Sequence, residues 1–199
     1  MIKFLKVIFL LLLSIMIFPN RKIIVFGDRR GFRFADNSRY LFLLLQKDIN
    51  YRCIWLTKSE SILDELKKKK LECYKADSLK GVYYSLKARW HIFNHSSRDT
   101  SENFSLFRNK LNLWHSTPIK KQTTFKNVNK IYEVLYRLKN FFSKEYLLLT
   151  DEILCNNLSK HFPKYKYKTF ISSLPKNIML SNEYKDLDFF RTDYEKSIL

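Results

Sequence analysis

The chain contains few of the residues that build tight turns and phosphate-binding loops. Its 199 residues include only 3 Gly and 4 Pro. Neither G-x-x-x-x-G-K-[ST] nor G-x-G-x-x-G occurs, so the two common glycine-rich phosphate loops are absent. The 3 cysteines (Cys53, Cys73 and Cys155) are widely spaced and form no C-x-x-C pair. This argues against a disulfide framework or a zinc knuckle and favours a reducing compartment.

Acidic residues are also scarce. There are 19 Asp and Glu against 37 Lys and Arg, which gives a formal net charge of +18. A surplus of this size predicts anionic partners, such as a membrane face, a polyphosphate, a nucleotide or a nucleic acid. No recognition helix, RRM or zinc-finger pattern is present, so a nucleic acid is not expected. Hydrophobic residues make up 46%, which is typical of a folded domain.

The amino-terminal 20 residues are strongly apolar. The run from Val7 to Phe18 carries no charge, and basic residues stand on both sides of it. The run is shorter than the roughly 20 residues of a spanning helix, and no small-residue cleavage site follows it. We expect residues 1–20 to form an apolar helix that anchors the chain to the anionic inner leaflet, as a monotopic anchor or a single short span. The alternative is a first helix packed on the domain.

The region 22–180 alternates between apolar, β-branched segments and helical patterns. The strands are expected around 22–26, 51–56, 72–76, 90–94, 111–114, 146–150 and 168–172. This alternation predicts an α/β fold, a Rossmann-like, mostly parallel sheet with helices on both faces. Residues 181–199 are expected to be a polar tail.

Two expected strands end in histidine-containing loops. Residues 111–114 lead into His115, Ser116 and Thr117, and then into Lys120 and Lys121. In an open α/β sheet, ligands bind beyond the carboxyl ends of the strands. A histidine there can take a proton, and hydroxyls and lysines suit a phosphate. The alternative is an ordinary strand end with solvated lysines.

The second histidine, His95, follows the strand at 90–94 and is a weaker candidate of the same kind. His91 lies inside that strand and is expected in the core.

The loop after the first strand contains Gly31 and is followed by Asp36, Asn37 and Ser38. These three polar residues predict a helix cap. A contact of Gly31, Asp36 and Asn37 with an anion or an acceptor at the helix amino terminus is the functional alternative.

The segment WHSTPIKK, residues 114–121, resembles the WHGTPLKK signature of the CDP-glycerol glycerophosphotransferase family, the teichoic-acid and capsule polymerases. Ser116 stands where the family has glycine. Segments 36–42 and 54–58 are also similar to the family, and 173–177 resembles its G-x-P-R-N-D turn, with Lys176 in place of arginine.

The resemblance implies the amino-terminal domain of a two-domain GT-B transferase. In the family, the turn at Pro175 leads to a second domain that binds the CDP-alditol. We therefore expect this chain to supply only the acceptor-side half, with little activity alone. It would be either a truncated product or one half of a split enzyme whose companion chain carries the donor-binding domain.

The resemblance also implies a reaction in which an acceptor hydroxyl attacks the alditol phosphate of CDP-glycerol or CDP-ribitol, and CMP leaves. His115 would be the base that removes the hydroxyl proton. Ser116 and Thr117 would donate hydrogen bonds, and Lys120 and Lys121 would attract a lipid-linked phosphorylated acceptor at the cytoplasmic membrane face. Gly31, Asp36, Asn37 and His95 are the further substrate-binding candidates. The sequence shows no set of metal ligands.

Two other functions fit the same residues. One is a non-enzymatic, membrane-tethered basic module that binds a polyanionic polymer or lipid. The other is half of a glycosyltransferase that uses a nucleotide sugar. The sequence does not choose between glycerol and ribitol, or between a primase and a polymerase.

Overall fold

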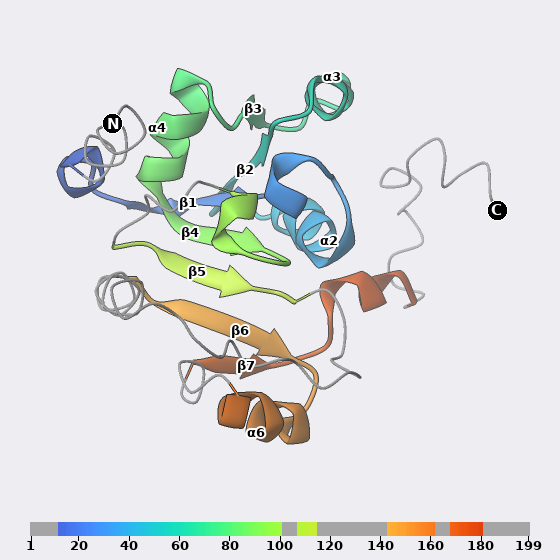
Figure 1. Ribbon diagram of the computed structural model, residues 1–199. Coiled ribbons are helices and arrows are strands. Elements are labelled where there is room, and N and C mark those ends of the chain that lie inside the picture. Colours follow the sequence, from blue (N-terminus) through green and yellow to red (C-terminus); the bar gives the residue numbers. More distant parts are fainter. Residues whose placement is uncertain (1–11, 101–106, 115–142, 162–167, 181–199) are drawn as a thin grey trace.

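The computed structural model describes residues 12–100, 107–114, 143–161 and 168–180 (Figure 1). They form a seven-stranded sheet in the order β3-β2-β1-β4-β5-β6-β7, and every recorded strand pair is parallel. The strands are β1 Asn20–Phe26, β2 Arg52–Thr57, β3 Cys73–Lys75, β4 Ala88–Phe93, β5 Asn109–Asn112, β6 Glu145–Leu149 and β7 Thr169–Ile171. The predicted α/β, Rossmann-like sheet is confirmed.

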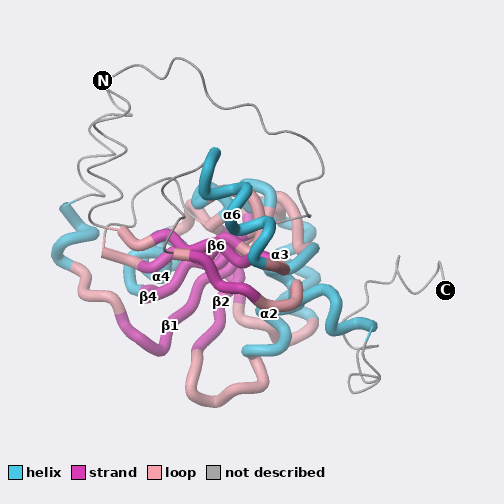
Figure 2. The backbone as a smooth tube through the Cα atoms, turned by 90° about the horizontal axis from the view of Figure 1, so that it is seen from below, coloured by secondary structure: helices cyan, strands magenta, loops and turns pink. Residues whose placement is uncertain are grey.

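Helices lie on both faces of this sheet (Figures 1 and 2). The described α-helices are α2 Asp36–Leu45, α3 Glu60–Lys68, α4 Leu79–Lys87 and α6 Glu152–His161. Short 3₁₀ turns are η1 Arg29–Gly31, η2 Ser97–Asp99 and η4 Pro175–Leu180.

Alternate residues of the central strands divide the core between the two faces. Ile24 and Phe26 of β1 pack with Phe42 of α2 and with the side chains of α3. Ile23 and Val25 belong to a second cluster on the α4 side. A strand that is buried on both faces must be apolar along its whole length, which is why its sequence is a continuous hydrophobic run.

The strand order reverses between β1 and β4. From β1 the chain continues to β2 and β3 on one side, and from β4 it continues to β5, β6 and β7 on the other. The loops that follow β1 and β4 therefore meet at the carboxyl edge of the sheet, where the order reverses. Such a switch point is the usual ligand site of an open α/β sheet.

The expected apolar helix over residues 1–20 is described only in part. Residues 12–16 are helical, and residues 1–11 lie outside the described residues. Within the described part of the chain, no helix combines the length and the apolar character needed to cross a membrane. The expected membrane attachment of residues 1–20 stays a prediction.

Arg108 holds this amino-terminal segment on the domain. Its guanidinium is buried and donates to the carbonyl oxygens of Ser14 at 2.7 Å and Ile17 at 2.6 Å, and its Nε donates to the carbonyl oxygen of Leu86 at 2.9 Å. The last carbonyl groups of a helix have no partner within the helix. One arginine thus satisfies carbonyls at the end of the amino-terminal segment and of α4. Burial lowers the pKa of Arg108 to about 10.

Candidate functional site

The main predicted site residues lie outside the described residues. These are His115, Ser116, Thr117, Lys120 and Lys121. Their neighbour Trp114 is described, two residues after the end of β5. It has a left-handed backbone with φ 56°, and its N–H donates to Asn112 Oδ1 at 2.9 Å. The chain therefore turns at Trp114, at the carboxyl edge of the sheet.

Asn37 connects three parts of this edge. Its Nδ2 donates to the carbonyl oxygen of Trp114 at 2.8 Å, and its Oδ1 accepts from the backbone N–H of Lys176 at 3.2 Å. The residue is completely buried. The prediction that Asn37 caps the helix is wrong, because its amide bonds to β5 and η4. The proposed contact of Asn37 with substrate stays a prediction.

Asp36 and Gly31 are also engaged within the protein. Asp36 Oδ1 lies 3.6 Å from Lys176 Nζ and accepts from the N–H of Asn37 at 3.0 Å. The carbonyl oxygen of Gly31 accepts from Thr57 Oγ1 at 2.8 Å and from the N–H of Lys58 at 2.6 Å. Gly31 has φ +86°, which side chains rarely adopt, so glycine is required by this turn.

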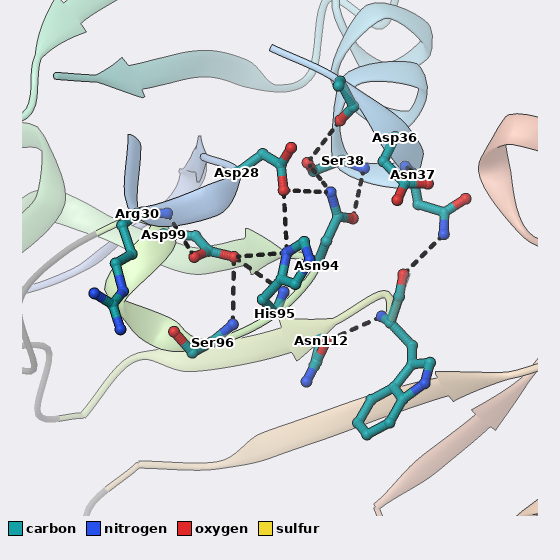
Figure 3. A network of polar contacts seen from close by, with 12 residues as sticks. Asp28, Arg30, Asp36, Asn37, Ser38, Asn94, His95, Ser96, Asp99 and Asn112 are labelled. Carbon is teal, nitrogen blue, oxygen red and sulfur yellow. Dashed lines mark hydrogen bonds and ion pairs between the residues drawn. The ribbon is translucent and has the colours of Figure 1, made fainter. Parts of the chain in front are cut away.

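His95 lies beside two carboxylates that come from distant parts of the sequence (Figure 3). Its Nδ1 is 3.3 Å from Asp28 Oδ1 and 3.8 Å from Asp99 Oδ2. Both carboxylates are buried, with side chains 2% and 1% exposed, whereas the His95 side chain is 35% exposed. The ring therefore reaches from a buried acidic pair to the surface.

Each carboxylate is held in place by its own hydrogen bonds. Asp99 accepts from the backbone N–H groups of Arg30 at 2.9 Å, His95 at 3.0 Å and Ser96 at 3.3 Å. Asp28 Oδ1 accepts from Asn94 Nδ2 at 3.0 Å.

The buried Asn94 also bonds to Ser38, which ties this cluster to α2. Ser38 Oγ accepts from Asn94 Nδ2 at 2.9 Å, and the Ser38 N–H donates to Asn94 Oδ1 at 3.0 Å. The network of Figure 3 thus joins the ends of β1 and β4 to the start of α2.

Gly27 permits this arrangement. A Cβ atom at Gly27 would stand 2.1 Å from the carbonyl oxygen of Asp99, a backbone atom, so the turn that carries it would have to shift. The end of β1 and the η2 turn can approach only because this residue has no side chain. That approach brings Asp28 and Asp99 to the same imidazole.

The two histidines of this strand differ in environment. Burial raises the pKa of the Asp28 carboxyl beside His95, while the hydrogen bond from Asn94 opposes the shift. His91 is fully buried between the Ser85 carbonyl oxygen at 2.9 Å and Thr100 Oγ1 at 3.0 Å. Its burial lowers its pKa to about 3, so His91 is a neutral core residue, as predicted.

Among the described residues, Asp28, His95 and Asp99 form the one group of ligand atoms close enough to hold a metal ion, with all three within 4.8 Å of one another. His95 was predicted from its place after a strand, but neither aspartate was. Asp28 and the Asn94-His95 pair directly follow β1 and β4, so the rule for strand ends would have found them. No sequence signal identifies Asp99, whose role depends on the close approach at Gly27.

The comparisons with known proteins agree with this fold. No curated protein matches the chain. Three solved structures of the wall teichoic acid polymerase TagF do match. The first gives a TM-score of 0.61 at 19% identity, over 85% of this chain and 43% of that one. A histidine-to-asparagine variant soaked with CDPG gives 0.59 at 18% identity, with coverage of 85% and 43%. A histidine-to-alanine variant gives 0.61 at 19% identity, with the same coverage.

The identity to these structures supports the fold alone, and the chain spans less than half of their length. The family model is more informative. The model for CDP-glycerol:poly(glycerophosphate) glycerophosphotransferases matches residues 9–195, nearly the whole chain. This match includes the ends of β1 and β4 and the WHSTPIKK segment. The chain therefore belongs to the CDP-glycerol:poly(glycerophosphate) glycerophosphotransferase family.

Proposed function

We propose that this chain supplies the acceptor-side half of an enzyme that transfers glycerol phosphate, or ribitol phosphate, from a CDP-alditol to a membrane-linked acceptor in teichoic acid or capsular polymer synthesis. The family match over residues 9–195 carries this proposal. The polar residues at the switch point of the sheet support it, because in an open α/β sheet this edge is the usual place for a ligand, and the signature loop begins there after Trp114.

The proposed step needs a proton acceptor for the attacking hydroxyl and cations for the phosphate charge. The resemblance gives the first role to His115 and the second to Lys120 and Lys121, with Ser116 and Thr117 as hydrogen-bond donors. At this edge of the sheet, the His95 side chain is partly exposed, at 35%. Asn37 contributes to this edge through its amide, which donates a hydrogen bond to the carbonyl oxygen of Trp114, the residue before His115.

The donor-binding part is proposed to lie outside these 199 residues. The chain matches 43% of the length of TagF. A catalytic histidine without a bound donor would lack the proximity that makes such a transfer fast. We therefore expect little transfer from this chain alone.

A transfer assay tests this proposal. Labelled CDP-glycerol, with CDP-ribitol in parallel, is offered with a lipid-linked acceptor to the chain alone and to the chain with a donor-binding companion. Transfer that needs the companion and is lost in His115→Ala is the expected result. Transfer by the chain alone would contradict the proposal that another chain binds the donor. Polymer binding that persists in His115→Ala, without any transfer, would identify a binding module, and transfer from a UDP-sugar would identify a glycosyltransferase.

We also propose that the amino-terminal segment attaches the chain to the cytoplasmic face of the membrane. Its apolar side chains point outward, with Leu12 and Ile15 each 55% exposed, Met16 74% and Phe18 79%, whereas Ser14 is 1% exposed. Arg108 bonds to the Ser14 carbonyl and hydroxyl and so fixes which side faces the domain. The net charge of +18 complements an anionic leaflet.

Vesicle flotation tests this attachment. The chain should float with vesicles that contain an anionic lipid, and much less with neutral vesicles. A double variant, Met16→Ser with Phe18→Ser, should lose most of the binding. Phe32→Ser is the matched control, because Phe32 is also exposed, at 59%, but lies in another loop. Equal flotation of the double variant and the control would overturn the proposed membrane face.

A further inference from the structure

Within the described part of the chain, four exposed arginines follow β1 and β4 at the carboxyl edge of the sheet. Three belong to the loop after β1 and one to the η2 turn after β4, and together they form the arginine group: Arg29, Arg30, Arg33 and Arg98. The η1 and η2 turns contact each other, and the Arg30 N–H donates to Asp99 Oδ1 at 2.9 Å. Two distant segments thus bring positive charge to the edge where an open α/β sheet usually binds ligands.

Among the described residues, no ion pair or hydrogen bond occupies the guanidinium groups of the arginine group. The carboxylates of the same edge have other partners. Asp99 accepts from three backbone N–H groups, and Asp28 accepts from a side-chain amide. Asp36 lies 3.6 Å from Lys176 Nζ. Figure 3 shows the Arg30 side chain extending away from the two buried carboxylates, so its charge faces a ligand instead of an internal partner.

The η1 turn presents its arginines on a strained backbone. Arg29 and Arg30 have φ values of 44° and 60°, in the left-handed region that residues with a side chain rarely adopt. The turn is held by the Gly31 N–H, which donates to the Asp28 carbonyl oxygen at 2.8 Å, and by the Thr57 hydroxyl, which donates to the Gly31 carbonyl oxygen at 2.8 Å. Backbone of this kind is concentrated at ligand sites. A loop fixed in this way loses little entropy when it binds.

The arginine group lies two strands away from the loop that contains the family signature. Because β4 stands between β1 and β5, and neighbouring strands are about 4.8 Å apart, the loops after β1 and β5 leave the sheet roughly 10 Å apart. Six single bonds join successive phosphorus atoms in a polymer of glycerol phosphate, and they span about 7 Å when extended. A polymer whose terminal hydroxyl reaches the signature loop would therefore bring its last one or two phosphates to the arginine group.

We propose that the arginine group binds the last phosphates of the acceptor, a poly(alditol phosphate) chain. This inference rests on the proposed function and deepens it, because it names the class of acceptor. A guanidinium binds a phosphate through two parallel hydrogen bonds, which makes arginine suited to this task. An acceptor without an alditol phosphate unit has no phosphate at this distance from its terminal hydroxyl. The enzyme therefore elongates an existing polymer and does not add the first unit.

Anionic lipids are a second source of phosphate, but they bind elsewhere. The amino-terminal segment proposed to attach to the membrane precedes β1, whereas the arginine group follows the other end of this strand. The 7 residues of β1 span roughly 20 Å at about 3.3 Å per residue. Headgroups held by the amino-terminal segment are thus far from the arginine group, and a soluble polymer should bind the group without a membrane.

Binding of a soluble, fluorescent glycerol-phosphate oligomer to the chain alone tests this subsite. The double variant Arg29→Gln with Arg30→Gln should bind the oligomer about 10-fold or more weakly, with a shallower dependence on salt. The matched control is Arg21→Gln with Lys22→Gln, which removes the same charge from the exposed first turn of β1. The control should change binding on the order of 2-fold, because charges so distant are screened. An equal loss in both double variants, or no binding by the unchanged chain, would overturn the proposal.

A second pair of substitutions avoids the strained turn. Arg33 and Arg98 are not among the described residues with left-handed backbone, so Arg33→Gln with Arg98→Gln should leave folding unchanged. This pair should also weaken oligomer binding. Normal binding in both arginine pairs would show that the arginine group does not hold the polymer.

Kinetics with the complete enzyme, the chain together with its donor-binding part, separate this subsite from the transfer reaction. For an acceptor with several alditol phosphate units, Arg29→Gln with Arg30→Gln should raise KM about 10-fold, a larger change than in kcat. An unchanged KM in an enzyme that transfers would refute the subsite and leave the proposed function intact. Oligomer binding that needs the arginines, in an enzyme that transfers no alditol phosphate, would support the subsite and count against the transfer reaction.

Discussion

Asn37 Nδ2 donates a hydrogen bond of 2.8 Å to the carbonyl oxygen of Trp114, 77 residues further along the chain. With the bond from the Lys176 N–H, this one amide joins the start of α2, the end of β5 and the η4 turn. All three segments include residues of stretches that resemble the family, 36–42, 114–121 and 173–177.

The first prediction concerns this amide. Asn37→Asp keeps an oxygen for the Lys176 N–H but replaces the donor to Trp114 with an oxygen that faces a carbonyl. We expect the free energy of unfolding to fall by about 2 kcal/mol, since a buried acceptor loses its partner. Urea unfolding followed by circular dichroism measures the change.

Asn20→Asp is the matched control for this variant. Asn20 is exposed, and its Oδ1 accepts from the Lys22 N–H at 2.9 Å, a bond that aspartate can also make. Equal stability of the two variants would show that the bond to Trp114 contributes nothing.

The second prediction concerns Gly27. In Gly27→Ala, the new Cβ would meet the Asp99 carbonyl oxygen at 2.1 Å, so the η2 turn must move away from β1. We expect a loss of about 2 kcal/mol of stability from this overpacking. The movement should also separate Asp28 from Asp99, which an altered His95 resonance would report. A His95 resonance identical to that of the unchanged chain would contradict the argument.

Arg108 gives the third prediction. Arg108→Met fills similar space but leaves the carbonyls of Ser14, Ile17 and Leu86 without their donor. Stability should fall by roughly 3 kcal/mol, and the amide hydrogens of residues 12–18 should exchange faster. Arg89→Met is the control, because the exposed contact of Arg89 reaches one carbonyl, that of Phe107, at 3.3 Å. Unchanged exchange of residues 12–18 in Arg108→Met would show that another contact holds the segment.

The fourth prediction is a pH dependence from His91. Its pKa is 6.5 in its ordinary state and about 3 in the folded protein. Between these values the unfolded chain binds the proton and the folded chain does not, so stability is fully present above pH 6.5 and falls as the pH is lowered towards 3. His91 alone makes the free energy of unfolding change by up to about 1.4 kcal/mol per pH unit in this range.

Urea unfolding of the chain and of His91→Gln at pH 7, 6, 5 and 4 measures this contribution as the difference between the two slopes. The glutamine amide can still reach the Ser85 carbonyl, which favours folding of the variant. Parallel pH dependences would mean that another group accounts for the acid sensitivity.

The sequence by itself determined the fold class, and it named the strand ends where the site is predicted. Continuous apolar runs at β1, β2 and β6 can be buried only in a sheet covered on both faces, so the fold class followed from local pattern. The neutral, buried state of His91 followed from its place inside a strand. The position of His95 just after β4 also placed it at the ligand-binding edge.

Only the tertiary structure decided which side chains meet at that edge. Asn37 looked like a helix cap because caps are local, but its partners lie 77 and 139 residues away. Asp99 looked like part of an irregular loop, and Arg108 like one of many basic residues. Their roles depend on burial and on carbonyl groups of distant segments. Hydrophobic periodicity does not predict such contacts, because each one forms only after the strands have packed.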